Sequence, residues 1–228
     1  MIKFARMASS LTLFHTDTIL PCTNVSNHLW ETERASSHGI TCHRLKISRR
    51  IDPIINGISN MDNYTPDFSK ILPDPTIIML SHVIPAKDIK NALLSWDIIV
   101  NQFKLTKLFL NIYGSTDKVP WYTVECETLL TTLNLRNNVK LKGFGDSKTV
   151  LKSAWAVLNS SMTEGLPLAL GEAGLSGAPI ICTEAGGSRE VIKNEEGHAY
   201  GKTVNTNSPY ELALGQVSVL GLFDVCTL

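Results

Sequence analysis

The chain has 228 residues, with 21 basic and 21 acidic side chains and therefore a net charge of zero. Hydrophobic residues make up 43% of the sequence and charged residues 18%, which is enough apolar material to build a core and excludes disorder of the whole chain. A balanced charge without a basic run argues against nucleic acid or an anionic membrane as the main partner.

The cysteines and the hydropathy pattern indicate a compartment rather than a function. Five cysteines, at positions 22, 42, 126, 182 and 226, are far apart and form neither a C-x-x-C motif nor a His/Cys cluster with zinc-ligand spacing. Free thiols in a reducing compartment are the expected state. No apolar run reaches the roughly 18 residues that a membrane-spanning helix needs. We therefore expect a cytoplasmic location, or the cytoplasmic face of a membrane if the chain is part of a longer protein.

The first 75 residues show no regular periodicity. Prolines at positions 21, 53, 66, 73 and 75 interrupt any pattern, and several Ser, Thr and Asn residues lie between them. One or two short strands, a helix over about 29–36 and a linker are the expected contents.

From residue 76 onward the sequence alternates between strand and helix patterns. The run 76–83 is continuously apolar, as in a strand that is buried on both faces. Further strands are expected at 107–113, 139–144, 156–159 and 179–183, and helices at 88–100, 121–135, 147–154, 168–175, 188–192 and from 208 through 214. Such alternation predicts an α/β fold, a Rossmann-like parallel sheet flanked by helices. Ligands of these sheets bind where the strands end, so the loops after those strands are the candidates for a site.

The most informative stretch is 159–192, which reads NSSMTEGLPLALGEAGLSGAPIICTEAGGSREVI. Glu164 follows a predicted strand, and Gly165 beside it lets the backbone approach a ligand closely. The helix that opens near Pro167 directs its free N–H groups into the crevice, which suits a phosphate. Glu172 lies about two turns into that helix, where it can bind the hydroxyls of a ribose. Spacing alone leaves open a surface pair of glutamates on an amphipathic helix.

The residues around the two glutamates favour a ligand site over a surface pair. The stretch has two glutamates with seven residues between them. In this spacing and in the surrounding residues it closely resembles the corresponding segment of the family-4 retaining glycosyltransferases, which have the GT-B fold. Other segments agree in order and spacing, namely NGI at 56–58, VIPAKDIKNAL at 83–93, YGSTDKVPWYTVECETLL at 113–130 and LNLRNNVKLKGFGD at 133–146. The resemblance covers roughly residues 17–215. It implies a C-terminal Rossmann domain that holds a nucleotide-diphosphate sugar and an N-terminal domain that holds the acceptor.

The resemblance also implies roles for individual residues. Lys87 matches the lysine that contacts the phosphates, although a solvated lysine at a helix start is the plainer alternative. Glu164 would meet the hydroxyls of the donor sugar, with backbone N–H groups from Gly165 and Leu166. Glu172 would bind the ribose. Gly143 and Phe144 fall in the base-binding loop, whereas Gly186 and Gly187 are expected to serve a turn.

The sequence departs from the family pattern at a residue that is expected to bind the phosphates. Where the wider family has Gly-Arg after the first strand, this chain has Ser81-His82. His82 replaces the arginine only in part, because the charge of a histidine at pH 7 depends on its pKa. A histidine that is simply hydrogen-bonded at a strand end is the alternative.

The expected function is transfer of a hexose from a nucleotide-diphosphate sugar, with a UDP-sugar as the expected donor, with retention of configuration. The sequence contains no Asp-x-Asp, the motif that holds a metal in the other major glycosyltransferase fold, so we expect neither a metal nor a cofactor. The partners would be the nucleotide sugar and a carbohydrate or lipid-linked acceptor, but no nucleic acid. Residues 56–228 would form the donor domain and residues 1–55 a remnant of the acceptor-side Rossmann domain, as in a fragment of a larger enzyme.

Two alternatives stay open. One is a non-catalytic module that binds nucleotide sugars but lacks turnover, because the arginine and the acceptor domain are missing. The other is an unrelated Rossmann-type protein with a chance match. No G-x-G-x-x-G follows the first clear strand, so the sequence does not support dinucleotide binding.

Overall fold

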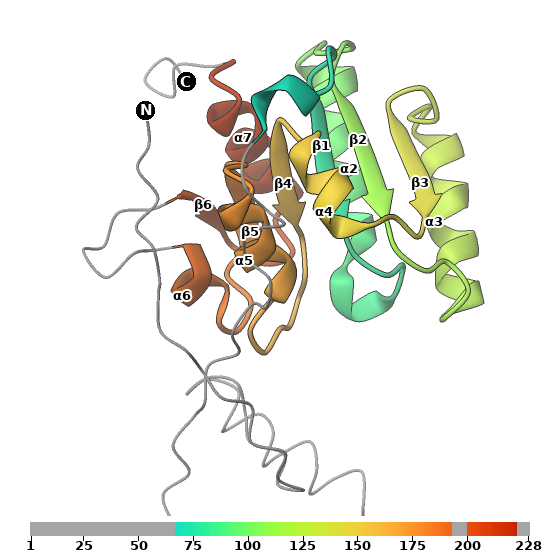
Figure 1. Cartoon of the computed structure of the whole chain (residues 1–228). Helices are drawn as coiled ribbons and strands as arrows, with labels where there is room; N and C mark the ends of the chain where they lie inside the picture. The colour runs from blue at the N-terminus through green and yellow to red at the C-terminus, as the bar shows by residue number, and fades with distance from the viewer. Residues whose placement is uncertain (1–66, 193–199, 223–228) are drawn as a thin grey trace, which may run out of the picture.

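The computed structural model describes residues 67–192 and 200–222. This part of the chain forms one parallel sheet with helices on both of its faces (Figure 1). The α/β, Rossmann-like fold class expected from the sequence is therefore confirmed. The expected strands and helix of the first 66 residues, and the proposed acceptor-side remnant 1–55, lie outside the described residues.

The sheet has six strands in the order β3-β2-β1-β4-β5-β6, and all neighbours are parallel. The strands are β1 (Thr76–Leu80), β2 (Phe109–Tyr113), β3 (Val139–Gly143), β4 (Ala156–Asn159), β5 (Ile180–Thr183) and β6 (Gly201–Val204). The chain first builds outward from β1 to β3 and then returns to place β4 on the other side of β1. The connections therefore reverse direction between β1 and β4, and such a switch point opens a crevice for a ligand.

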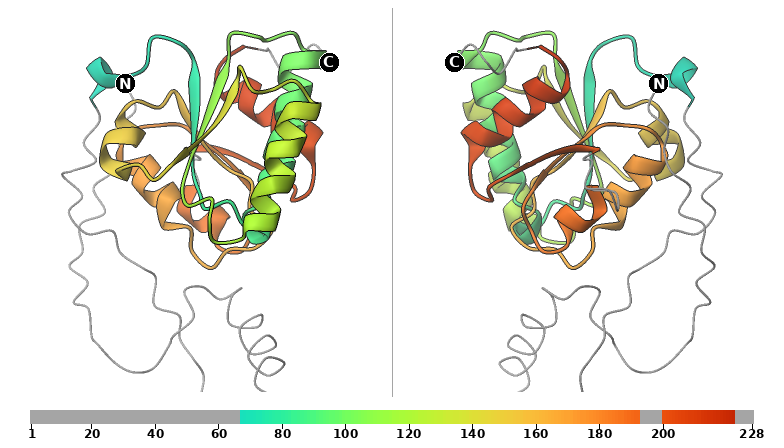
Figure 2. Two further views of the ribbon diagram at one scale, coloured as in Figure 1. Left: turned by 90° about the vertical axis from the view of Figure 1, so that its right-hand side faces the viewer. Right: turned by 90° about the vertical axis from the view of Figure 1, so that its left-hand side faces the viewer.

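The helices divide between the two faces of the sheet (Figure 2). One face carries α2 (Ile89–Asp97), its π-helical continuation η5 (Ile98–Gln102), α3 (Pro120–Thr132) and α7 (Pro209–Val219). The other face carries α4 (Ser147–Lys152), α5 (Leu168–Leu175) and α6 (Ser188–Ile192). Two short 3-10 helices, η3 (Phe68–Lys70) and η4 (Pro85–Lys87), flank β1 along the chain.

Strand β1 shows why the sheet is buried on both sides. Ile77 and Met79 pack into the core beneath α2, α3 and α7, whereas Ile78 packs into the core beneath α4, α5 and α6. Alternate side chains of a strand point to opposite faces, so a continuous apolar run is needed to fill two cores. The apolar run 76–83 was therefore a sound indicator of a central strand, although the strand itself ends at Leu80.

Strand β6 was not expected from the sequence. It lies at the edge of the sheet, and only Val204 of its four residues is buried. Other expected elements differ in extent: α2 ends at Asp97 before the π-helical turn, α3 ends at Thr132, and α7 continues to Val219. Cys126 and Cys182 are free, as expected, and both are buried, while the other three cysteines lie outside the described residues. Within the described residues, we find no helix with the length and apolar character that crossing a membrane requires.

Candidate functional site

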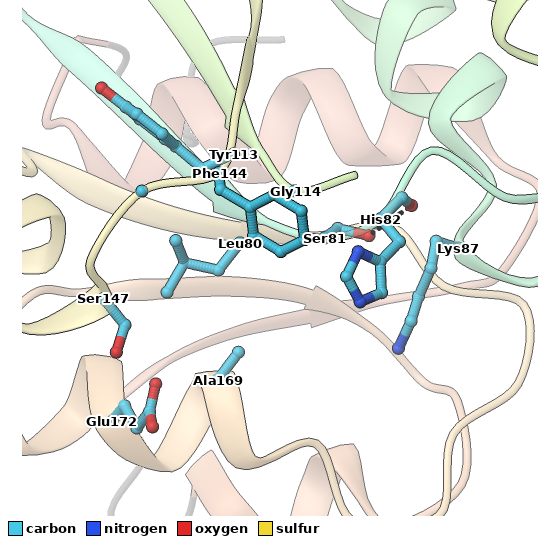
Figure 3. A pocket seen from close by; sticks show the side chains of 11 residues that line it. Leu80, Ser81, His82, Lys87, Tyr113, Gly114, Phe144, Ser147, Ala169 and Glu172 are labelled. Atoms are coloured by element: carbon cyan, nitrogen blue, oxygen red, sulfur yellow. Dashed lines mark hydrogen bonds between the residues drawn. The ribbon is translucent and has the colours of Figure 1, made fainter. Parts of the chain in front are cut away.

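A pocket of about 280 Å³ lies at the carboxyl ends of the strands, beside the switch point (Figure 3). Its lining residues come from the ends of β1 and β2, from the β3–α4 loop and from the first turns of α4 and α5: Leu80, Ser81, His82, Lys87, Tyr113, Gly114, Phe144, Gly145, Ser147, Ala169 and Glu172. Four of the residues that the sequence analysis proposed for the site line this one cavity, although they are up to 90 positions apart: His82, Lys87, Phe144 and Glu172.

The first turn after β1 positions the two basic side chains. His82 lies directly beyond the strand, and Lys87 ends the 3-10 helix η4, which starts with Pro85 at its first position. Asp88 then adopts a left-handed conformation with φ of 44° and accepts a hydrogen bond from the Asn91 N–H as the cap of α2. Figure 3 shows the His82 ring and the Lys87 ammonium at one end of the pocket, with Ser147 and Glu172 at the other.

The His82 ring is held in one orientation by the neighbouring strand. The Ser115 N–H donates a hydrogen bond to its Nδ1 at 3.0 Å, so the proton of the neutral ring resides on Nε2. The ring also meets the Phe144 ring edge-on, with centroids 6.1 Å apart. Burial lowers the pKa of His82, and the positive charges of Lys118 and Lys87 lower it further against the opposing effect of Asp117. His82 is therefore a neutral donor at pH 7 and not a permanent cation.

Gly114 allows β1 and β2 to come close at the pocket wall. A Cβ at this position would lie 2.2 Å from the Ser81 carbonyl oxygen, and φ is +156°. The Ser81 N–H donates to the Tyr113 carbonyl at 2.7 Å, so the two strands stay paired as they enter the site. Glycine at this position therefore gives the pocket its tight wall.

Glu164 forms an ion pair with a lysine of the pocket. Its Oε1 accepts a hydrogen bond from Lys87 Nζ at 2.6 Å, and its side chain is only 10% exposed. Asn159 Nδ2 donates to the same oxygen at 3.2 Å, and Ser161 Oγ donates to it at 2.7 Å. Glu164 therefore contacts a residue of the pocket but does not itself line the pocket.

The loop that carries Glu164 is packed against the turn after β5. A Cβ on Gly186 would lie 1.8 Å from the Glu164 carbonyl oxygen, and the Gly187 N–H donates to the Gly165 carbonyl at 2.8 Å. The two glycines thus serve a turn, as expected, and this turn also supports the Glu164 loop. Within the described chain, the N–H groups of Gly165 and Leu166 make no hydrogen bond, although neither residue lines the pocket.

The base-binding loop expected from the sequence divides into two parts. Phe144 lines the pocket and is 79% exposed, so its ring is available to a planar ligand. Gly143 does not line the pocket. It has φ of +70°, and its carbonyl accepts the Gly114 N–H at 2.7 Å, so it shapes the turn that presents Phe144.

Several site residues could not be read from the sequence. Tyr113 and Ser147 line the pocket, Ser115 orients His82, and Asn159 and Ser161 orient Glu164. All five follow or end a strand or begin a helix at the carboxyl edge, which is the one signal that could have found them. Among residues 67–192 and 200–222, no group of three His, Cys, Asp or Glu side chains could hold a metal ion.

The fold is a Rossmann-like domain with a pocket at the carboxyl ends of its strands. The sequence profile of a family described as "Glycosyl transferases group 1" matches residues 61–215, and the chain belongs to this family. No curated protein matches the chain.

Several solved structures share the fold of this chain. S. aureus TarM, a mutant in complex with Fondaparinux, alpha-GlcNAc-glycerol and UDP, is 18% identical with a TM-score of 0.62, over 78% of this chain and 34% of TarM. Anabaena HepE in complex with UDP is 21% identical with a TM-score of 0.65, over 75% of this chain and 48% of HepE. Sucrose-phosphate synthase from Thermosynechococcus elongatus is 19% identical with a TM-score of 0.66, over 84% of this chain and 47% of the synthase. The chain thus spans about a third to a half of the length of these three proteins.

Proposed function

We propose that this chain is the donor-binding part of a family-4 retaining glycosyltransferase and that it transfers a hexose from a nucleotide-diphosphate sugar. The observation that carries the proposal is the convergence of Lys87, His82, Phe144 and Glu172 on one pocket at the switch point of the sheet. UDP is the favoured nucleotide, because the solved structures of TarM and HepE are complexes with UDP.

The phosphate subsite would lie between η4 and the start of α5. Lys87 supplies a positive charge and His82 a neutral Nε2–H donor. Ala169, in the first turn of α5, lines the same pocket, so the positive end of the helix dipole faces the ligand. Gly165 and Leu166 add backbone N–H groups without a described partner. These groups suit a diphosphate.

The nucleoside would extend to the other end of the pocket. Glu172 accepts hydrogen bonds from ribose hydroxyls, a role that suits a carboxylate near a diphosphate because the hydroxyls are neutral donors. Phe144, exposed at the mouth of the pocket, packs against the base, with Gly143 fixing the loop. Glu164, beside Lys87, receives the hydroxyls of the sugar.

The transfer step requires stabilisation of the leaving group more than a protein base. The bond between sugar C1 and the diphosphate oxygen breaks, and its electron pair stays on the diphosphate. The acceptor hydroxyl oxygen bonds to C1 on the same face, and its proton passes to the departing diphosphate, which gives retention. Lys87, His82 and the α5 dipole stabilise the negative charge that develops, without a metal ion.

The remaining parts of the assignment are proposals as well. The acceptor is a carbohydrate or a lipid-linked carbohydrate, held by a second Rossmann domain of which residues 1–55 would be part. Residues 56–228 would form the donor domain. The location is cytoplasmic, where nucleotide sugars are available to the pocket.

Isothermal titration of the 228-residue chain with UDP tests the donor site. We expect binding in the micromolar to millimolar range, and the variant Lys87→Gln should weaken it by about 10- to 100-fold, the range for a hydrogen bond to a charged group. Lys90→Gln is the matched control, because Lys90 lies three residues away in an exposed ion pair with Glu125 and does not line the pocket. A folded chain that binds no UDP at millimolar concentration would refute the proposal.

A non-catalytic binding module is the second candidate. It is favoured by the neutral state of His82 and by the pairing of Lys87 with Glu164, which leave little free positive charge at the phosphate subsite. The variant His82→Arg separates the two candidates. A gain of UDP-sugar hydrolysis or transfer indicates a weakened enzyme, whereas tighter UDP binding without turnover indicates a module.

A further inference from the structure

Glu164 is held by more donors than its pairing with Lys87 requires. Lys87 Nζ, Asn159 Nδ2 and Ser161 Oγ all donate to the same carboxylate oxygen, Oε1. We propose that Asn159 and Ser161 are positioning residues that keep Glu164 directed at the donor sugar after Lys87 has moved to the diphosphate. This inference rests on the function proposed above.

Lys87 is the donor that can leave. Its side chain is 27% exposed, and an ammonium group on a flexible four-carbon stem can change partners by rotation. Lys87 also lines the pocket, whereas Glu164 does not. A bound diphosphate would therefore attract the ammonium away from the carboxylate. Glu164 would then lose its only cationic partner among the described residues at the moment when the sugar needs a fixed acceptor.

Asn159 and Ser161 are the donors that stay. Asn159 ends β4 and is 9% exposed, and Ser161 is fully buried. The Asn159 Oδ1 accepts the Ser161 N–H at 2.8 Å, so each residue fixes the other. Thr183 Oγ1 donates to the Ser161 carbonyl at 2.6 Å and ties the loop to β5. The two donors are thus part of the folded core and need not move when a ligand binds.

The geometry leaves one carboxylate oxygen for a ligand. All donors to Glu164 in the described chain reach Oε1, and Oε2 accepts none of them. A carboxylate that is fixed through one oxygen presents the other in a defined direction, which is what recognition of sugar hydroxyls requires. Asn159 and Ser161 would therefore act on the sugar through Glu164, without contacting the sugar themselves.

The test compares the affinities of UDP, UDP-glucose and UDP-N-acetylglucosamine for the 228-residue chain. Ser161→Ala removes one donor. Asn159→Ala removes the other, together with the oxygen that accepts the Ser161 N–H, without adding a charge beside Glu164. For each variant we expect UDP affinity within about twofold of the unaltered chain, while affinity for the better-bound nucleotide sugar falls about tenfold, the effect of one hydrogen bond to a charged group. Ser161→Thr, which retains the hydroxyl, should restore most of that loss.

The control is Ser95→Ala, which removes an equally buried hydroxyl from α2, far from Glu164 in the sequence, where it donates to the Ala92 carbonyl. It should alter neither affinity. Equal loss of UDP and nucleotide-sugar binding, or failure of both site variants to fold, would show a merely structural role and overturn the inference. Unchanged affinities in both variants would also overturn it. Absence of UDP binding by the unaltered chain would instead refute the proposed function itself.

Discussion

His82 is the residue at which the chemistry of the pocket is most open to experiment. Its Nδ1 accepts the Ser115 N–H, and burial together with Lys118 and Lys87 lowers its pKa below the ordinary value of 6.5. A diphosphate bound beside Nε2 would favour the protonated ring and raise that pKa again. Protonation and ligand binding must then support each other.

The resulting prediction concerns the pH dependence of UDP affinity. UDP should bind the unaltered chain increasingly better than His82→Gln as the pH falls from about 8 to about 5, because protonated His82 adds a cation; the affinity ratio should change about fivefold, as for one partly exposed ion pair. The effect of UDP's own titration on affinity is the same for both proteins and cancels in the ratio. Titration calorimetry at four pH values measures it, and a ratio that is constant with pH would contradict the coupling between protonation of His82 and UDP binding.

Gly186 is a second residue whose role can be measured. It has φ of +52° and faces the Glu164 carbonyl oxygen so closely that a Cβ would lie 1.8 Å away. We expect Gly186→Ala to lower the free energy of unfolding by about 3 kcal/mol, because backbone must move in addition to the strain of a left-handed alanine. Gly221→Ala is the control, since Gly221 has φ of +67° in open space and should lose only about 1 kcal/mol. Urea unfolding gives both values, and equal losses would show that the contact is unimportant.

At the scale of elements, the periodicity of the sequence predicted the sheet and nearly every helix. Buried strands such as β1 and β4 were found because both of their faces must be apolar. Strand β6 was missed because an edge strand with a single buried residue has no such pattern. The pairing of Lys87 with Glu164 was not predicted either, since it joins the end of η4 to the loop after β4, 77 residues further along the chain. The motif resemblance identified the candidate site residues, whereas their contacts with one another depend on the folded topology.

Helix α2 contains a buried side-chain amide without a described hydrogen-bond partner. Asn91 is 2% exposed, and neither atom of its side-chain amide has a described partner. Asn91→Leu should therefore raise the free energy of unfolding by about 1 kcal/mol, because a buried amide without partners is unfavourable and leucine has a similar size. Asn101→Leu in η5 is the control and should be destabilising, because Asn101 Nδ2 donates to Asp97 and to the Leu133 carbonyl. Loss of stability in Asn91→Leu would show that water occupies a place beside the amide.

At the scale of the whole molecule, ligand binding should appear as increased stability of the folded chain. UDP at about 100 times its dissociation constant should add about 2.7 kcal/mol, which corresponds to a rise of roughly 5 to 10 °C in Tm. Uridine, which lacks the diphosphate, should raise Tm much less. Differential scanning calorimetry measures the Tm shift with each ligand. Equal shifts would show that the diphosphate contributes nothing to binding.

The same measurement tests the expected independence from metal ions. The Tm shift with UDP should be the same in EDTA and in millimolar Mg²⁺, because Lys87, His82 and the start of α5 would contact the diphosphate directly. A shift that disappears in EDTA would require a metal bridge and would revise the proposed mechanism.

The placement of β4 beside β1 also has a consequence for the order in which the protein is made. Strand β1 is synthesised first, but one of its two neighbours in the sheet is translated only after β2, α3, β3 and α4. A nascent chain that has emerged only through α4 therefore carries a central strand with one open edge. Strand β4, which closes this edge, also leads to Glu164, so the Lys87–Glu164 contact can form only once β4 and the loop after it have emerged. Nucleotide binding would therefore distinguish chains that contain this segment from chains that stop at α4.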